Sequence, residues 1–288
     1  MSDTTPPDEG VEMETVTVSD GTEIAFKRTG SGVPLVFVHG SWSSHHTWDG
    51  VVPTMAESFC AVAYDRRGHS QSEYRSERPP GQGCVDEHVS DLREIIERLD
   101  LAPAWVVGNS FGASIALRLA AAHAELLDGV IAHEPPLYDL IADDPELAQL
   151  VEEDEEMTAT VTDRIASGDH EGGARQFIEF ELGSGGWSQL PPDIQATLIE
   201  NAPAFLDEAS DPDQYAFDLS WLAEFHRPVM LTTGSEGLPT YAGVVSRLAD
   251  TLPAVEIAQF DGASHTPHET HPDEYIVAIR DFIRKNTQ

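Results

Sequence analysis

Gly108-Asn109-Ser110-Phe111-Gly112 is the stretch that decides the fold of this chain. The apolar run 104–107 precedes it and an Ala- and Leu-rich run, 113–122, follows it, so a strand is predicted before the serine and a helix after it. A tight turn from strand to helix leaves no room for side chains beside the serine, which explains the two glycines. With backbone N–H groups of a helix N-terminus beside it, Ser110 has the setting of a nucleophile elbow.

Strand and helix patterns alternate on both sides of this turn. Residues 12–18 and 23–27 flank Asp20-Gly21 and predict a β-hairpin. Further strands are predicted at 34–38, 60–64, 104–107, 129–132, 229–232 and 255–260, with core helices at 86–99 and 273–284. Repeated β-α units favour the α/β class, here a mostly parallel eight-stranded sheet flanked by helices.

More than ninety residues separate the strand that ends near His133 from the one that begins at Val229. One crossover helix needs far fewer, so residues 137–223 are predicted to form an inserted helical cap. Residues 1–136 and 224–288 are then the core. Cap helices are predicted at 145–165, 173–181, 193–204 and 213–225.

The charge balance is extreme, with 51 acidic against 16 basic residues and a formal net charge of −35 over 288 residues. The acidic residues are spread along the chain, which indicates adaptation of the whole surface. Such a surface repels itself in dilute buffer and is screened in molar salt, where the Debye length is about 3 Å. We expect a halophilic protein from a salt-rich cytoplasm, and we exclude nucleic acid and anionic membranes as partners.

Targeting signals and cysteine content also favour a cytoplasmic protein. Residues 1–10 show no cationic start and no apolar export signal. The longest apolar helix candidate, 113–122, contains Arg118 and is too short to cross a bilayer. Cys60 and Cys84 are expected to be reduced thiols. We therefore expect a cytoplasmic protein with no membrane partner; the sequence leaves its oligomeric state open.

Three further motifs lie where a known family carries its own. They are Val38-His39-Gly40-Ser41, Tyr64-Asp65-Arg66-Arg67-Gly68-His69-Ser70 and Gly262-Ala263-Ser264-His265-Thr266-Pro267. With the elbow, they make the chain resemble the capped branch of the α/β-hydrolase family over nearly all residues after Glu12. The resemblance implies the chain order nucleophile, acid, histidine.

The resemblance gives roles to the candidate catalytic residues. Ser110 is expected to be the nucleophile and His265 its base, since a serine hydroxyl needs a base within hydrogen-bond reach. Backbone N–H groups of Ser41 and Phe111 are the expected oxyanion donors, with Trp42 as the substitute for Ser41 if the loop is offset.

Two glutamates compete for the place of the triad acid. Many relatives carry an Asp after the penultimate strand, where this chain has Gly237, with Glu236 beside it. Some capped relatives, including haloalkane dehalogenases, carry the acid after the strand that follows the nucleophile helix, where this chain has Glu134. We favour Glu134 and keep Glu236 as the alternative, because geometry and not sequence position defines a triad.

Other candidate residues concern metals and the substrate. The cluster His265, His268, Glu269 and His271 lacks the spacing of a metal-binding helix and is interrupted by prolines, so we expect neither metal nor cofactor. Candidates for the substrate-pocket wall are His39, His45, Trp187 and Trp221.

Serine and histidine together predict acyl transfer to water, because branches of the family that open epoxides or remove halides use aspartate as nucleophile. The leading hypothesis is a hydrolase of a small, neutral or apolar carboxylic ester. Lactone, thioester, C–C bond and peracid chemistry use the same residues, and a non-enzymatic small-molecule receptor is a further alternative. A polyanionic substrate is disfavoured, since the cap has 21 acidic residues against Arg164 and Arg175.

Overall fold

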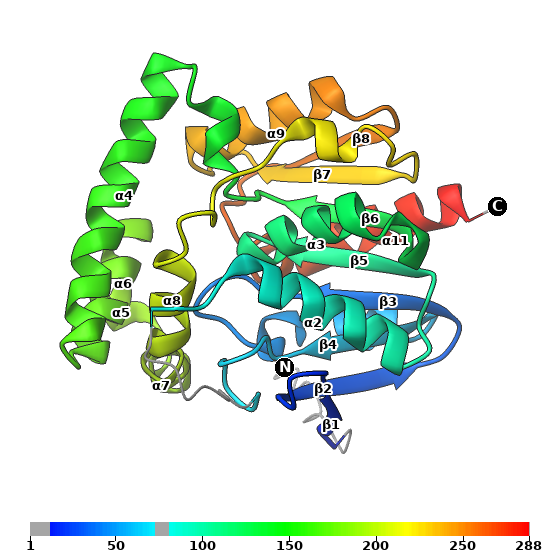
Figure 1. Ribbon diagram of the computed structural model, residues 1–288, viewed down its shortest axis with the longest axis horizontal. Coiled ribbons are helices and arrows are strands. Elements are labelled where there is room, and N and C mark those ends of the chain that lie inside the picture. Colours follow the sequence, from blue (N-terminus) through cyan, green and yellow to red (C-terminus); the bar gives the residue numbers. More distant parts are fainter. Residues whose placement is uncertain (1–11, 73–80, 288) are drawn as a thin grey trace, which may run out of the picture.

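The computed structural model describes residues 12–72 and 81–287 and is built on one eight-stranded sheet (Figure 1). Its strands lie in the order β1-β2-β4-β3-β5-β6-β7-β8. β1 and β2 pair antiparallel, as do β2 and β4, and every later pair is parallel. The strands are β1 Glu14–Thr17, β2 Glu23–Gly30, β3 Val33–Val38, β4 Phe59–Tyr64, β5 Ala104–Asn109, β6 Leu127–His133, β7 Val229–Gly234 and β8 Val255–Phe260. This confirms the predicted eight-stranded α/β fold.

Helices cover both faces of the sheet. One apolar core lies on the face of α2 (Val85–Arg98), α3 (Phe111–Ala122) and α9 (Pro239–Thr251), and a second lies on the face of α1 (Val52–Met55) and α11 (Pro272–Asn286). β3 to β7 are almost fully buried, as expected for parallel strands covered on both sides. The α3 helix is buried nearly all round, and its residues are small or apolar except for Arg118.

Five α-helices lie between β6 and β7 and stand over the carboxyl ends of the parallel strands (Figure 1). They are α4 Pro145–Ala166, α5 His170–Glu181, α6 Gly186–Gln189, α7 Pro192–Glu200 and α8 Ala202–Ala209. We call these five helices the cap. Their own apolar core includes Trp42, which stacks on Phe205 at 4.3 Å between ring centroids. Since Trp42 belongs to the loop after β3, the cap packs directly on that loop.

One helix prediction in this region was confirmed only in part, and another was wrong. The stretch 193–204 is divided into α7 and α8 at Asn201, because Pro203 fits only the first turn of a helix. The stretch 213–225 is irregular apart from one short 3₁₀ turn, Leu219–Leu222. Asp211 and Asp218 accept backbone N–H groups two residues further on, at 2.9 and 2.8 Å. Such local bonds replace the helical ones.

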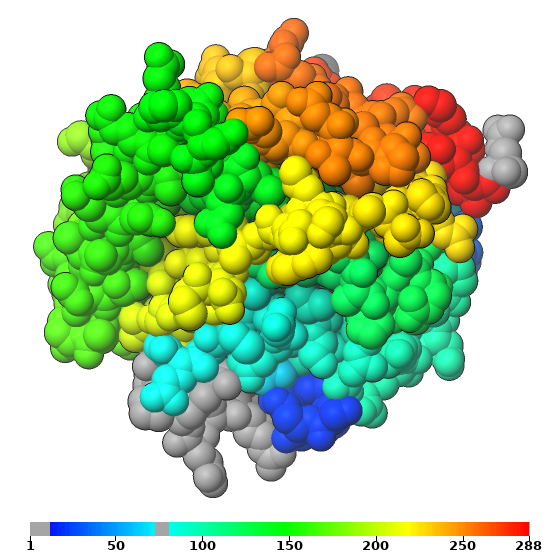
Figure 2. Space-filling view, turned by 45° about the horizontal axis from the view of Figure 1, so that its top comes forward, coloured from blue at the N-terminus to red at the C-terminus, as the bar shows by residue number. Residues whose placement is uncertain are grey.

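Polar contacts tie the cap to the core. The Asn201 amide nitrogen donates to the carbonyls of Trp42 and Ser43, and its oxygen accepts the Ser70 N–H at 2.8 Å. Asp207 of α8 accepts the Gln82 N–H, and Asp211, just after α8, accepts the N–H of Val85, the first residue of α2. Figure 2 shows the segment that contains residues 207–211 (yellow) lying against the cyan residues that follow 81.

No helix in the described part of the chain is long and apolar enough to cross a membrane. Cys60 and Cys84 are free thiols. The expected absence of an export signal concerns residues 1–10, which lie outside the described residues.

Candidate active site

Ser110 lies at the sharp turn between β5 and α3, with φ 54° and ψ −125°. A Cβ at Gly108 would lie 2.4 Å from the Gly112 carbonyl oxygen, and one at Gly112 would lie 2.3 Å from that of Val38. Both positions therefore require glycine. The turn holds a non-glycine residue at positive φ, a strained conformation typical of functional positions.

His265, in the loop after β8, donates from Nδ1 to Glu134 Oε2 at 2.7 Å. Glu134 follows β6, is fully buried and has φ 45°. Its other oxygen accepts the Thr233 hydroxyl and the Gly234 N–H, both at 2.8 Å. Burial acts to raise the pKa of Glu134, but the contacts with His133 and His265 outweigh it and hold that pKa well below its ordinary range. Glu134 is thus an ionised carboxylate that accepts a hydrogen bond from His265.

Gly237 leaves room for the Glu134 carboxylate. A Cβ at position 237 would lie 2.6 Å from Glu134 Oε1. The position at which the resemblance implies an Asp is therefore vacant, and the Glu134 carboxylate fills the space. Glu236, the alternative acid, is exposed, and in the described part of the chain its side chain makes no hydrogen bond to His265.

Two residues that the sequence analysis missed hold the histidine in place. Asn109, beside the nucleophile, donates its amide N–H to the His265 carbonyl at 3.0 Å. Tyr241 of α9 stacks on the imidazole, with ring centroids 4.4 Å apart and planes at 12°. Asn109 lies inside the elbow motif, so its position was a signal; Tyr241 gave none.

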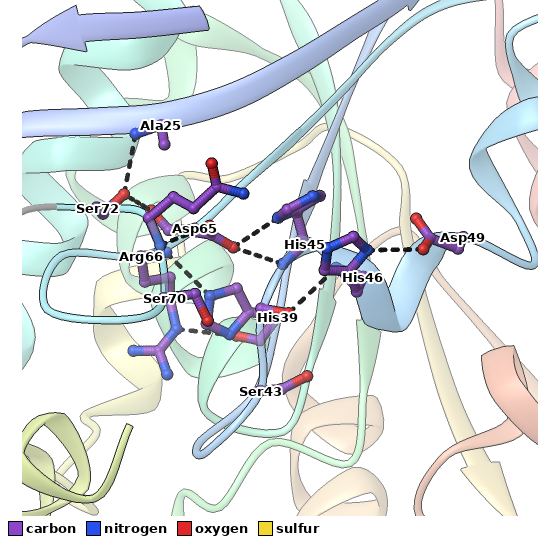
Figure 3. A network of polar contacts seen from close by, with 12 residues as sticks. Ala25, His39, Ser43, His45, His46, Asp49, Asp65, Arg66, Ser70 and Ser72 are labelled. Carbon is purple, nitrogen blue, oxygen red and sulfur yellow. Dashed lines mark hydrogen bonds and ion pairs between the residues drawn. The ribbon is translucent and has the colours of Figure 1, made fainter. Parts of the chain in front are cut away.

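The loop after β3, which begins at His39, is held in place by a buried polar network (Figure 3). Arg66 donates to the carbonyls of His39 and Gly40 at 3.0 and 2.9 Å. The His39 ring accepts the Arg66 N–H at 2.9 Å and donates to the Gly40 carbonyl at 2.8 Å. Burial, with Arg66 nearby, lowers the pKa of His39 well below its ordinary value, so this ring is neutral.

The expected oxyanion donors lie at the top of that loop and at the start of α3. Within the described residues, the backbone N–H groups of Ser41, Trp42 and Phe111 have no acceptor. All three residues line one cavity of about 620 Å³, together with Ser110 and His265. Ser110 and His265 make no hydrogen bond to each other in this structure, and such contacts often tighten only when substrate binds.

The four predicted pocket residues, all described, lie outside the lining of this cavity. His39 and His45 are buried in the network under the loop, where the His45 ring bonds Asp65 at 2.8 Å. Trp187 packs in the apolar core of the cap. Trp221 is 47% exposed and lines a separate groove. Hydrogen bonds hold the two histidines under the loop, and apolar packing holds Trp187 in the cap. Trp221 lies in the irregular segment 213–225, which places it at the separate groove.

His268 belongs to the histidine-rich segment that the sequence analysis rejected as a metal site. The buried His268 ring bonds the Thr47 hydroxyl at 2.8 Å, and burial lowers its pKa well below the ordinary value. Among the described residues, His133, Glu134 and His265 are the one group whose ligand-type atoms all lie within 4.8 Å of one another. Glu134 and His265 are already paired there by the 2.7 Å bond.

Comparison with known proteins agrees with this fold. Residues 33–272 match a family model described as the alpha/beta hydrolase fold. A non-heme chloroperoxidase of Streptomyces lividans is 28% identical over 94% of this chain and 100% of its own length. A non-heme haloperoxidase of Rhodococcus erythropolis is 30% identical over 73% of this chain and 80% of its own. A thermophilic esterase from Thermogutta terrifontis has the same fold, with a TM-score of 0.75 and 20% identity over 96% of this chain and 100% of that one.

Proposed function

This chain belongs to the α/β-hydrolase fold family and is an enzyme of the hydrolase class, and from that premise we propose that it is a serine hydrolase of carboxylic esters. The observation that carries the proposal is the 2.7 Å bond to the buried Glu134 carboxylate from His265, which lines the same cavity as Ser110. Ser110 is the nucleophile, His265 the general base and then acid, and Glu134 the orienting acid.

In this mechanism Ser110 Oγ attacks the ester carbonyl as His265 Nε2 takes its proton. Backbone N–H groups of Phe111 and of Ser41 or Trp42 stabilise the oxyanion. The alcohol leaves with the proton from His265, and an acyl-serine remains. Water, deprotonated by the same histidine, then releases the acid and regenerates Ser110.

The test compares p-nitrophenyl acetate and butyrate hydrolysis by the wild type and Ser110→Ala in about 2–3 M KCl, where surface charge is screened. The proposal expects turnover that the substitution reduces by a factor on the order of 10³ or more. Equal rates in both proteins would place the chemistry elsewhere. No turnover by folded wild type would reject simple esters as substrates.

A second candidate, perhydrolysis, is favoured by the names of the two haloperoxidase relatives. Hydrogen peroxide in place of water would convert the acyl-serine to a peracid and free Ser110. Peracetic acid formed from p-nitrophenyl acetate and peroxide in a Ser110-dependent reaction would support it, whereas acetate alone would reject it.

A further inference from the structure

The cavity that contains Ser110 is lined by carboxylates and by neither lysine nor arginine, all of its lining residues being described. The acidic lining residues are Asp49, Asp154, Glu181, Asp193, Glu208 and Glu269. Only Glu208 has an arginine partner, Arg66 at 2.6 Å. Asp49 is paired with the His46 ring at 2.8 Å. Apart from these two, the lining carboxylates form no ion pair among the described residues, so an anionic substrate would meet an excess of negative charge.

Two of these carboxylates face the cavity from neighbouring cap helices. Asp154 belongs to α4 and Glu181 ends α5, and both side chains are half-buried. Within the described residues, neither forms an ion pair with lysine, arginine or histidine. Burial and the neighbouring Glu181 raise the pKa of Asp154 to about 7, and burial also raises the pKa of Glu181. The cavity is thus lined by two carboxylates that resist joint ionisation.

A row of tyrosine rings connects this pair to the catalytic histidine. Tyr215 packs on Tyr138 at 4.8 Å between centroids, and Tyr138 lies 6.1 Å from Tyr241, which stacks on His265. All three tyrosines line the cavity, and Tyr138 and Tyr241 are 4% and 6% exposed. Aromatic faces attract cations, and the attraction grows where water is excluded.

Building on the proposed ester hydrolysis, we propose that the preferred substrate is an ester with a cationic ammonium group, which binds between Asp154 and Glu181 against the tyrosine row. The cavity supplies the room, the carboxylates the charge and the rings the apolar contact. A cation there removes the repulsion between the two carboxylates, so substrate binding relieves a cost that the free enzyme bears.

The test uses two isosteric substrates, p-nitrophenyl 4-(trimethylammonio)butyrate and p-nitrophenyl 5,5-dimethylhexanoate, at one fixed KCl concentration. The wild type should prefer the cationic ester in kcat/KM by a factor on the order of tenfold, chiefly through KM. Asp154→Asn/Glu181→Gln should abolish this preference. The matched control, Glu152→Gln/Glu156→Gln, removes two exposed charges from α4, the helix of Asp154. This control should keep the preference, which distinguishes binding in the pocket from general attraction of a cation to an acidic surface.

The preference should also depend on pH, falling as pH drops below 7 and Asp154 takes up a proton. Equal kcat/KM for the two esters in the wild type, with turnover that needs Ser110, would overturn the cation site and leave the esterase proposal standing. Loss of the preference in the control variant would also overturn it.

Calorimetric titration with tetramethylammonium tests the site without catalysis. The wild type and the control variant should bind this ion, and Asp154→Asn/Glu181→Gln should not. If neither ester reacts but tetramethylammonium binds in this pattern, the esterase proposal fails and the cation pocket remains. If the wild type does not bind the ion, the cation pocket fails.

Discussion

Gly237 and Glu134 occupy the two positions at which relatives carry the triad acid, and of these two only position 134 has a carboxylate. Sequence patterns predicted Ser110 and His265 and left two candidates for the acid. The choice depends on whether a carboxylate and a glycine from different strands occupy the same space, and no local pattern carries that information. In the structure the Glu134 carboxylate lies where a side chain at position 237 would be.

Replacing Glu134 by Gln should lower kcat by a factor on the order of 10²–10⁴, because the histidine loses the acceptor that fixes its tautomer and stabilises its positive charge. Glu236→Gln is the matched control, since Glu236 is an exposed neighbour outside the bond network. Steady-state kinetics on p-nitrophenyl butyrate measure both. A large loss in the control with a small loss at Glu134 would transfer the acid role to Glu236.

Whether the two positions are equivalent can be tested by moving the carboxylate from position 134 to position 237. Glycine tolerates the positive φ of position 134, and position 237 does not have positive φ. Glu134→Gly should be nearly inactive, and adding Gly237→Asp should recover about tenfold or more in kcat/KM, since the new carboxylate starts beside the vacated site. If the double variant is no better than Glu134→Gly, the two positions are not equivalent.

At the scale of elements, periodicity predicted strands and long helices well and failed where side chains compete with the backbone. The aspartates at 211 and 218 form local turns that hydrophobic spacing does not reveal. Trp221 lies in the irregular segment 213–225, and it lines a separate groove and not the cavity that contains Ser110. The polar contacts through Asn201, Asp207 and Asp211 join segments more than a hundred residues apart, so only the fold brings them together.

Glu208 of α8 tests how firmly the cap is attached. It is buried and pairs with the buried Arg66 at 2.6 Å, below the loop that carries the oxyanion donors. Glu208→Gln leaves the arginine charge unpaired and should destabilise the protein by about 3–5 kcal/mol. Glu200→Gln, an exposed change on α7, should have little effect. Urea unfolding monitored by fluorescence gives both values, and a loss below about 1 kcal/mol would show that the pair is dispensable.

The Glu208–Arg66 pair also makes the stability of the fold depend on pH in the acid range. Burial acts to raise the pKa of Glu208, but Arg66 and His69 outweigh it and hold the pKa well below the ordinary value. A depressed pKa gives stability that is present above the unfolded pKa, about 4.3, and is lost as pH falls toward the folded value. Wild-type stability should therefore fall below about pH 5 more steeply than that of Glu208→Gln. Parallel curves would contradict this assignment.

At the scale of the whole molecule, the alternation of strands and helices was enough to predict the sheet and its class, because parallel strands need covering helices and right-handed crossovers. Strand order and the faces that the helices cover come from the structure. The net charge of −35 does not affect the fold but predicts behaviour in salt.

Thermodynamic stability should rise from low to molar KCl, because screening weakens the repulsion among 51 acidic residues. Guanidinium is itself a salt, so urea unfolding at several KCl concentrations is the measurement. Sucrose at matched water activity is the control for general exclusion from the surface. A flat response to KCl would reject the halophilic interpretation.

Covalent labelling of Ser110 tests the central claim most directly. A fluorophosphonate should add one adduct per chain to the wild type, mapped by peptide mass spectrometry to the peptide with Gly108-Asn109-Ser110-Phe111-Gly112. His265→Ala and Glu134→Gln should slow the labelling strongly, and Ser110→Ala should abolish it. Labelling at another residue, or an undiminished rate in His265→Ala, would contradict the assignment of Ser110, His265 and Glu134 as one catalytic unit.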